Sequence, residues 1–248
     1  MPSSIEGKTA LVTGAAGVMG LAVVRALLAE GAGVVMVDLA EKRLRELASE
    51  LGPRAVPAAF DITDPAASQR ELSRLEGSVG AVDILVNNAG ILSNHKTLDT
   101  TPEEWRRVVE INLSGMFYLS RAVIPGMKAK GWGRIVNVSS LAAQTGGLTA
   151  GTAYAASKGG VISLTRSLAA ETAPFGITAN AIAPAYDKTP MISEQLTEEQ
   201  RRAILGRIPV GRFCEPEEFA YVVLFLASPL AGFITGDLIN LNGGLYFN

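Results

Sequence analysis

The chain has 248 residues, of which 48% are hydrophobic and 19% are charged, and its formal net charge is −2. This is enough chain for one α/β domain with a large core, and the charge balance excludes the basic surface that nucleic-acid binding requires. A single cysteine, Cys214, and a single histidine, His95, exclude a disulfide framework and a His/Cys metal cluster. With no signal-peptide pattern and no apolar run of 18 residues, we expect a soluble cytoplasmic protein.

Short apolar segments alternate with amphipathic ones along the chain. Continuous apolar runs such as 34–37 are typical of strands buried on both faces, and the alternation predicts a parallel sheet with helices on both sides. The predicted strands are 8–13, 33–38, 55–60, 82–87, 133–139, 177–183 and 237–241. The predicted helices are 17–30, 41–51, 64–76, 102–130, 152–174 and 215–228. We therefore expect a doubly wound, seven-stranded, Rossmann-type sheet in a single α/β/α domain spanning 1–248.

A longer charged segment, 189–212, interrupts this rhythm between a predicted strand and a predicted helix. It contains a weak helical pattern at 193–206. Because insertions at the carboxyl end of a strand often cover a site, we interpret this segment as a substrate lid.

A glycine-rich turn follows the first predicted strand and opens the first predicted helix. Glycines there permit a tight turn and close approach of the backbone to a pyrophosphate at the helix N-terminus. The residues that we expect at this cofactor site are Gly14, Gly17, Val18, Met19 and Gly20.

Asp38 stands at the end of the second predicted strand, 18 residues after Gly20. Its carboxylate can accept hydrogen bonds from the adenosine ribose, and it would repel a 2′-phosphate by about 3 kcal/mol per unit charge at about 5 Å. No Arg or Lys lies beside it, although Lys42 and Arg43 follow on the next helix. We therefore expect NAD in preference to NADP. The alternative is an aspartate that only caps a turn.

Further cofactor contacts are predicted where the third and fourth strands end. Asp61, with its neighbour Ile62, can reach an adenine amino group, while Asp64 before Pro65 reads as a helix N-cap. Ala89 and Gly90 permit close approach to a ligand, and the preceding Asn88 is either a ligand contact or a turn residue.

Tyr154 and Lys158 are four residues apart in the predicted helix 152–174, so they share one face. An ammonium about 4 Å from a phenol is worth about 4 kcal/mol, enough to lower the tyrosine pKa from about 10 toward about 7. Such a phenol could exchange protons near neutral pH. The alternative, which the spacing alone favours, is a solvated helix face.

Ordered motifs in this chain together resemble the single-domain short-chain dehydrogenase/reductase family, from Gly7 to Gly244. The resemblance extends to reductases of 3-oxoacyl thioesters on acyl carrier proteins. The motifs are Thr13-Gly14 with Gly20, Asn87-Asn88-Ala89-Gly90, Val138-Ser139-Ser140, Tyr154-Ala-Ala-Ser-Lys158, Asn180-Ala-Ile-Ala-Pro184 with Thr189-Pro190, and Thr235-Gly236 with Gly243-Gly244.

This resemblance implies hydride transfer between NAD(P) and an alcohol or carbonyl carbon. It implies that Tyr154 is the general acid/base, that Lys158 lowers its pKa and holds the nicotinamide ribose, and that Ser140 binds the substrate oxygen. Asn112 would hold a water that relays protons from Lys158. Ser139 competes for the serine role, but Ser140 takes the family position.

The chain departs from the family pattern at the nicotinamide end of the site. Val18 replaces a glycine and would take up room, and Ala185 replaces a glycine after Pro184, at a cost of about 1 kcal/mol if φ is positive there. Asp187 replaces an apolar residue whose amide holds the carboxamide, as Thr189 would also do. A carboxylate there would favour oxidised NAD if it points inward; we expect it to point to solvent.

Three functions remain open on sequence. The first is an NAD-dependent oxidoreductase of a small secondary alcohol or ketone. The second is a reductase of 3-oxoacyl thioesters, for which Arg121, Lys128 and Lys130 could form part of a carrier-protein docking patch. The third is a non-catalytic dinucleotide-binding protein.

Two residues and the assembly complete the expectations. His95 is expected on a solvated loop, although it could touch substrate, and Cys214 is assigned no chemistry. The apolar helices 102–130 and 152–174 and the apolar tail 244–248 predict a homotetramer, with a dimer second. No metal, nucleic acid or membrane is expected as a partner.

Overall fold

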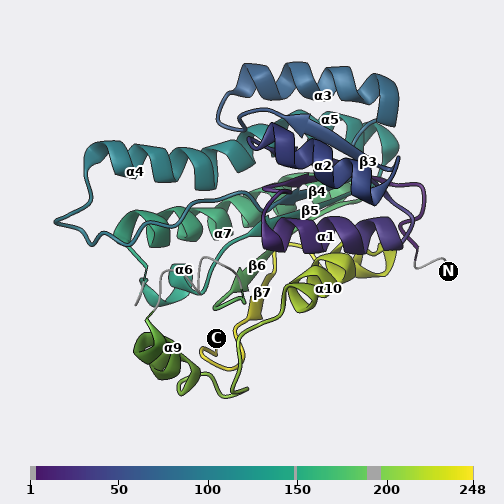
Figure 1. The fold of residues 1–248 in the computed structure, drawn as a ribbon. Coiled ribbons are helices and arrows are strands. Elements are labelled where there is room, and N and C mark those ends of the chain that lie inside the picture. The colour runs from purple at the N-terminus through teal and green to yellow at the C-terminus, as the bar shows by residue number, and fades with distance from the viewer. Residues whose placement is uncertain (1–3, 148–149, 189–196, 248) are drawn as a thin grey trace.

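The computed structural model describes residues 4–147, 150–188 and 197–247, and within them seven parallel strands form one sheet. The strand order is β3-β2-β1-β4-β5-β6-β7 (Figure 1), as the predicted doubly wound fold requires. The strands are β1 Thr9–Thr13, β2 Gly33–Asp38, β3 Ala55–Ala59, β4 Ile84–Asn87, β5 Gly133–Val138, β6 Ile177–Pro184 and β7 Leu238–Leu241.

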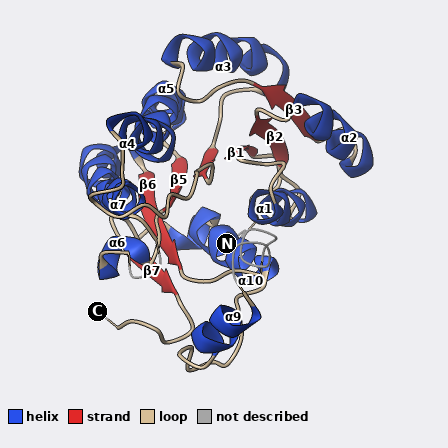
Figure 2. Cartoon of the chain, turned by 60° about the vertical axis from the view of Figure 1, so that its left-hand side comes forward, coloured by secondary structure: helices blue, strands red, loops and turns tan. Residues whose placement is uncertain are grey.

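Helices cover both faces of the sheet, because neighbouring residues of a strand point to opposite sides. Ala10 and Val12 pack in the core beneath α1, α2 and α10, whereas Leu11 packs beneath α3, α5 and α7. The turned view shows these two layers on either side of the strands (Figure 2). The longer helices are α1 Val18–Ala29, α2 Glu41–Leu51, α3 Pro65–Val79, α4 Pro102–Val109, α5 Gly115–Lys130, α7 Thr152–Thr172, α9 Glu198–Leu205 and α10 Pro216–Ala227.

The start of a helix was predicted correctly where the sequence contains a capping residue. Asp64 accepts hydrogen bonds from the amides of Ala66 and Ala67 at the start of α3, as its place before Pro65 indicates. The short helix α6, Ala142–Thr145, was not predicted, because four residues give no periodic pattern.

The predicted helical segment 102–130 is confirmed, but it is not α-helical throughout. A π-helical turn, Glu110–Ser114, separates α4 from α5. Its cause is visible in the packing. Asn112 sits fully buried in this turn and bonds to the main chain of Ile91 rather than to its own helix. π turns of this kind are often found at functional sites.

The carboxyl ends of the strands point to one edge of the sheet, where the chain order reverses between β1 and β4. Ligands of open α/β sheets bind at such a switch point. Of the predicted lid, the structure describes 197–212, which contains α9, and the remainder, 189–196, lies outside the described residues. Among the described residues, no helix has the length and apolar character needed to cross a membrane.

Candidate active site

The glycine-rich turn brings β1 against the N-terminus of α1. Gly14 has a φ of +65°, and a Cβ at Gly20 would stand 2.1 Å from the Gly14 carbonyl oxygen, so no side chain fits at position 20. Gly17 caps α1 through its backbone alone, and no described side chain bonds to the free amides that follow. The first turn of α1 also contains no acid. This uncapped helix end is suited to an anion such as a pyrophosphate.

Val18 does not obstruct this turn. Its side chain is 39% exposed at the first residue of α1, while Met19 packs against the core on the other side of the helix.

Asp38 fastens the end of β2 to the same turn. One carboxylate oxygen accepts a hydrogen bond from the Ala16 amide and the other from the Ala40 amide, each at 3.1 Å. Asp38 is thus a turn aspartate, as the alternative interpretation held. Its charge nevertheless stands at the end of β2, where it was predicted to meet the adenosine ribose.

The ends of β1 and β4 are joined through Thr13. Its hydroxyl accepts hydrogen bonds from the amides of Asn88 and Ala89, and the Asn88 side chain donates to the Thr13 carbonyl at 2.9 Å. Asn88 therefore holds the turn. A Cβ at Gly90 would lie 3.3 Å from the Lys158 ammonium. A glycine at this position therefore avoids a close contact with the lysine side chain.

Asp61 and Ile62 lie at the end of β3 with different surroundings. Asp61 is exposed and accepts two 2.8 Å hydrogen bonds from Thr63, one from the amide and one from the hydroxyl. Ile62 is buried against Gly115, so only its main chain can face a ligand.

Ser140, at the end of β5, is brought together with Tyr154 and Lys158 of α7. Ser140 lies close enough to the phenol to lower the pKa of Tyr154, and the Lys158 ammonium lies 5.9 Å from the centroid of the tyrosine ring. Lys158 is buried and donates a 2.7 Å hydrogen bond to the Val138 carbonyl. The pair is therefore not a solvated helix face.

The two serines after β5 are used differently. The Ser139 hydroxyl donates to the Lys158 main-chain carbonyl at 2.8 Å and so ties β5 to α7. Ser140 faces Tyr154, and its oxygen also accepts a hydrogen bond from the Ala142 amide. The geometry thus favours Ser140 for contact with a substrate oxygen.

In this structure the pKa of Tyr154 is raised rather than lowered. Burial is the largest cause, Ser140 lowers the pKa, and the Asp187 carboxylate raises it. The Lys158 ammonium donates a hydrogen bond to the Val138 carbonyl. Burial lowers the pKa of Lys158 itself to about 8.

Asn112 is committed to the main chain of Ile91. Its side-chain oxygen accepts from the Ile91 amide at 2.8 Å, and its nitrogen donates to the Ile91 carbonyl at 2.9 Å and to Ser157. These bonds hold the Asn112 side chain in place against the segment that follows β4.

The segment after β6 differs from what was expected for Ala185 and for Asp187. The backbone of Ala185 is unstrained, since none of the described non-glycine residues has a positive φ. Asp187 does not point to solvent: its Oδ1 atom is fully covered. The residue forms a short parallel bridge with Cys214, while Pro184 accepts a hydrogen bond from the Leu141 amide. Thr189 lies outside the described residues.

One cluster at the rim of the site was not predicted. Glu104 bonds to both Ser93 and His95 at 2.7 Å, and this contact raises the pKa of the exposed histidine. The Ser93 carbonyl accepts a hydrogen bond from the Gly151 amide, and the His95 carbonyl accepts one from the Thr152 amide. Gly151 and Thr152 lie at the start of α7, just before Tyr154. No local pattern signals contacts between segments so far apart in the sequence.

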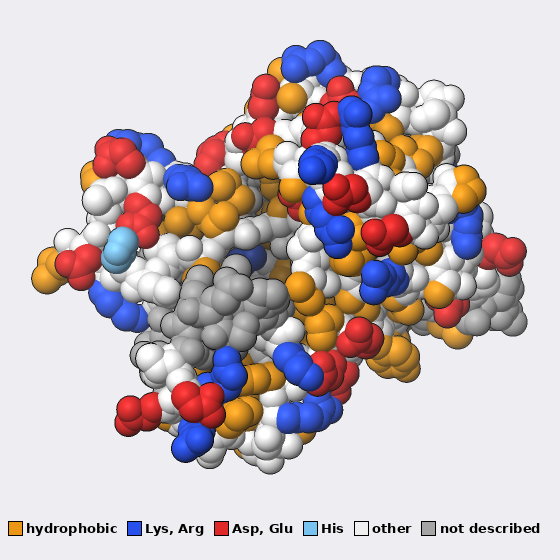
Figure 3. Space-filling model, in the orientation of Figure 1, with side chains coloured by type: hydrophobic (Ala, Val, Ile, Leu, Met, Phe, Trp, Pro, Cys, Tyr) orange, Lys and Arg blue, Asp and Glu red, His pale blue; other side chains and the backbone are white. Residues whose placement is uncertain are grey.

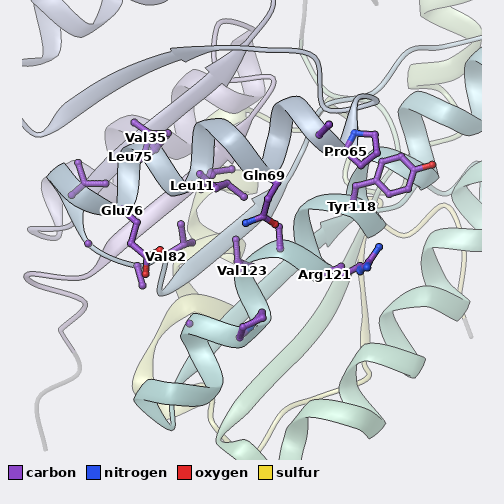
Figure 4. A pocket seen from close by; sticks show the side chains of 18 residues that line it. Leu11, Val35, Pro65, Gln69, Leu75, Glu76, Val82, Tyr118, Arg121 and Val123 are labelled. Carbon is purple, nitrogen blue, oxygen red and sulfur yellow. The ribbon is translucent and has the colours of Figure 1, made fainter.

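The face of the molecule that carries this edge is hollowed between α4 and α1 (Figure 3). A separate cavity of about 680 Å³ lies between α3 and α5, where Leu11, Gln69, Tyr118 and Arg121 are among the residues that line it (Figure 4). No predicted site residue lines that cavity, so it is not the candidate site. A smaller one, of about 280 Å³, is lined by Ala185 and Cys214 beside Asp187.

Comparison with known proteins agrees with this arrangement. A family described as enoyl-(acyl carrier protein) reductase matches residues 14–246. The 3-oxoacyl-[acyl-carrier-protein] reductase of Vibrio cholerae is 42% identical over 98% of this chain and 99% of its own length, and that of Escherichia coli is 40% identical over 98% and 99%. A crystal structure from Agrobacterium tumefaciens assigned as a gluconate dehydrogenase is 33% identical, with a TM-score of 0.94 over 98% of this chain and 97% of that one.

The fold, the glycine turn and the grouping of Ser140, Tyr154 and Lys158 agree with these full-length likenesses. We conclude that this chain is an oxidoreductase of the short-chain dehydrogenase/reductase family, whose members act with a nicotinamide dinucleotide.

Proposed function

We propose that this protein interconverts a secondary alcohol and a ketone, with Tyr154 as the general acid/base. The observation that carries the proposal is the buried Lys158 ammonium, 5.9 Å from the centroid of the Tyr154 ring, together with the buried Ser140, which lowers the pKa of that tyrosine. In the reducing direction, Ser140 donates a hydrogen bond to the substrate carbonyl and Tyr154 gives it a proton as the charge on oxygen develops. Lys158 holds the nicotinamide ribose, and Asn112 supports the proton relay from its π turn.

A bound dinucleotide supplies the hydride acceptor or donor, and the residues present fit one. The free amides of α1 suit the pyrophosphate, and the space at Gly20 admits no Cβ. The remaining proposed contacts are Gly14, Gly17, Val18, Met19, Asp38, Asp61, Ile62, Asn88, Ala89, Gly90, Pro184, Asp187 and Thr189.

We propose NAD rather than NADP as the cofactor. The support is the Asp38 carboxylate at the end of β2, which would repel a 2′-phosphate by about 3 kcal/mol per unit charge. Of the two nearby cations, Arg43 is paired with Glu46. Turnover with NADP(H) alone would overturn this assignment.

Two substrate classes fit the same chemistry, since a 3-oxoacyl thioester is reduced at a ketone carbon. The comparisons support the thioester better than the small free alcohol that the sequence analysis put first, because relatives at 40–42% identity are named for it. A point against it concerns the predicted carrier-docking cations. Lys130 bonds to Asp83, and Lys128 lies over the Phe175 ring. We therefore propose the thioester first and a small free alcohol second.

The decisive experiment follows reduction of NAD⁺ and NADP⁺, and oxidation of the reduced forms, across 3-hydroxyacyl and 3-oxoacyl thioesters, secondary alcohols and sugars. We expect turnover of at least one substrate class and a loss of about 10³-fold or more in Tyr154→Phe. A Tyr154→Phe variant with full activity would overturn the catalytic assignment. Binding of dinucleotide without turnover of any substrate would support the non-catalytic alternative.

Three further expectations belong to this proposal. The segment 189–212 acts as a substrate lid, the location is cytoplasmic, and the assembly is a homotetramer. The described residues support the last through exposed apolar side chains, which include Trp105 on α4, Phe117 on α5 and Phe247 in the tail.

A further inference from the structure

Asp187 places a carboxylate at the sheet edge where the candidate site lies. It follows β6 by three residues, and its bridge to Cys214 fixes the backbone. The Cys214 amide donates to the Tyr186 carbonyl at 3.0 Å, and the Lys188 amide donates to the Cys214 carbonyl at 2.8 Å. Because neighbouring amides of an extended chain point to opposite sides, the Asp187 amide faces away from Cys214.

This carboxylate is buried without a hydrogen-bonded counter-ion. Its Oδ1 atom is fully covered and accepts no hydrogen bond within the described part of the chain. Burial raises the pKa of Asp187 to about 6, and the neighbouring Cys214 opposes that rise, while the 3.4 Å hydrogen bond of its thiol goes to the Glu215 carbonyl. An uncompensated buried carboxylate is costly, and groups of this kind are concentrated at functional sites.

The basic side chains of the surrounding segments are engaged elsewhere. Lys158 bonds to the Val138 carbonyl, Lys188 pairs with Glu215 at 3.0 Å, and Arg212 pairs with Glu218 at 2.6 Å. The charge of Asp187 nevertheless reaches the tyrosine of the site, since it raises the pKa of Tyr154.

The chemistry of the proposed reaction requires the nicotinamide ring to lie near Tyr154. Hydride moves to or from the carbon whose oxygen exchanges a proton with Tyr154, so the nicotinamide ring must lie close to that carbon. The oxidised ring carries a positive charge and the reduced ring is neutral. A carboxylate therefore attracts one form of the cofactor and not the other.

We propose that the Asp187 carboxylate is the counter-ion of the oxidised nicotinamide ring and shifts the binding preference of this site toward the oxidised dinucleotide. The inference rests on the proposed function and adds a cofactor preference to it. A site that holds the oxidised form more tightly shifts the equilibrium on the enzyme toward bound oxidised cofactor and alcohol, while the overall equilibrium in solution is unchanged. A contact with the carboxamide would not do this, because both cofactor forms carry the same carboxamide.

The preference is expected to depend on pH. Asp187 is ionised above its pKa of about 6, so the advantage of the oxidised form is present at pH 7.5 and is lost as the pH falls below 6. The titratable and charged groups around it are Tyr154 and Lys158 on α7, Cys214, and the pairs Lys188–Glu215 and Arg212–Glu218. The pKa of Lys158, about 8, and that of Cys214, about 12, both lie above this range.

The test is equilibrium binding of NAD⁺ and NADH to the full chain by calorimetry between pH 5.5 and pH 7.5. We expect the ratio of the NADH to the NAD⁺ dissociation constant to rise with pH in the wild type. In Asp187→Asn the ratio should be lower by about tenfold at pH 7.5, equal to about 1.4 kcal/mol, and flat with pH. Glu217→Gln removes a charge from an exposed site on α10 and should leave the ratio unchanged.

A second variant guards against a trivial loss of structure. Cys214→Ala removes the neighbouring thiol, which lowers the pKa of Asp187, so the midpoint of the pH dependence should move upward while the ratio at high pH stays high. Equal weakening of both dinucleotides in Asp187→Asn, or a wild-type ratio that does not change with pH, would overturn the proposal. These binding measurements are independent of turnover, so failure of Tyr154→Phe to lose activity would overturn the proposed function alone.

Discussion

The Lys158 ammonium donates a 2.7 Å hydrogen bond to the main-chain carbonyl of Val138, on the strand that ends beside Ser140. This bond couples the lysine of α7 to the end of β5. It leaves the ammonium buried, with its charge only partly compensated by a carbonyl dipole. The buried charge of Lys158 therefore lowers the free energy of unfolding, and this effect can be measured.

Replacing Lys158 with methionine should change how stability depends on pH. The pKa of Lys158 is lowered by burial from 10.5 to about 8, so between these values the unfolded chain binds more protons than the folded one. The free energy of unfolding of the wild type should therefore rise with pH from 8 to 10, relative to Lys158→Met, by up to about 3 kcal/mol. Urea denaturation at several pH values measures this. Lys188→Met, at an exposed position, is the control, and parallel curves for Lys158→Met and wild type would contradict the assignment.

The two serines after β5 should separate catalysis from stability. Ser140→Ala is expected to lower kcat by about 10²-fold or more, because a hydrogen bond to the developing oxyanion is lost. Ser139→Ala should keep kcat within about twofold and lower the free energy of unfolding by about 1 kcal/mol, since only its bond to the Lys158 carbonyl is lost. Steady-state kinetics and urea denaturation of both variants provide the check. The reverse pattern would assign the role to Ser139.

Gly20→Ala should destabilise the fold by about 2 kcal/mol or more, because the added Cβ would stand 2.1 Å from the Gly14 carbonyl oxygen. Gly17→Ala is the matched control, because its Cβ would meet only that same oxygen, at 3.4 Å, and φ is −78° there. Thermal unfolding of the two variants tests this. Similar melting temperatures for both would show that the turn opens more easily than its packing indicates.

Asp38→Asn should move cofactor preference toward NADP. Loss of the charge removes about 3 kcal/mol of repulsion toward a 2′-phosphate, so the ratio of kcat/KM for NADP⁺ to that for NAD⁺ should rise by tens-fold or more. The control is Asp61→Asn, since both cofactors contain the adenine that Asp61 is proposed to meet. That variant should weaken both equally. An unchanged ratio in Asp38→Asn would remove the basis for the NAD assignment.

Light scattering at micromolar protein should give a mass about four times the 26.0 kDa of the chain. Phe117→Glu, which places a charge on an exposed apolar position of α5, should give a smaller species. Lys42→Glu changes the charge of an exposed residue of α2 and should leave the mass unchanged. A wild-type monomer would refute the predicted assembly.

The fold was readable from the sequence because its signals are local. Apolar runs such as 34–37 on buried strands, the glycine turn before α1 and the Asp64-Pro65 cap each act within a few residues of chain. The π turn at 110–114 was not readable, because it depends on a bond between Asn112 and Ile91, 21 residues earlier.

The candidate site divides in the same way. The sequence by itself placed Tyr154 and Lys158 on one helix face and set Asp38 at the end of a strand, since helical spacing and strand order are properties of the chain. Only the tertiary structure decided that Ser140 rather than Ser139 faces Tyr154, that burial raises the pKa of that tyrosine, and that Asp187 is turned inward. These depend on desolvation and on contacts between distant segments, for which a linear pattern carries no signal.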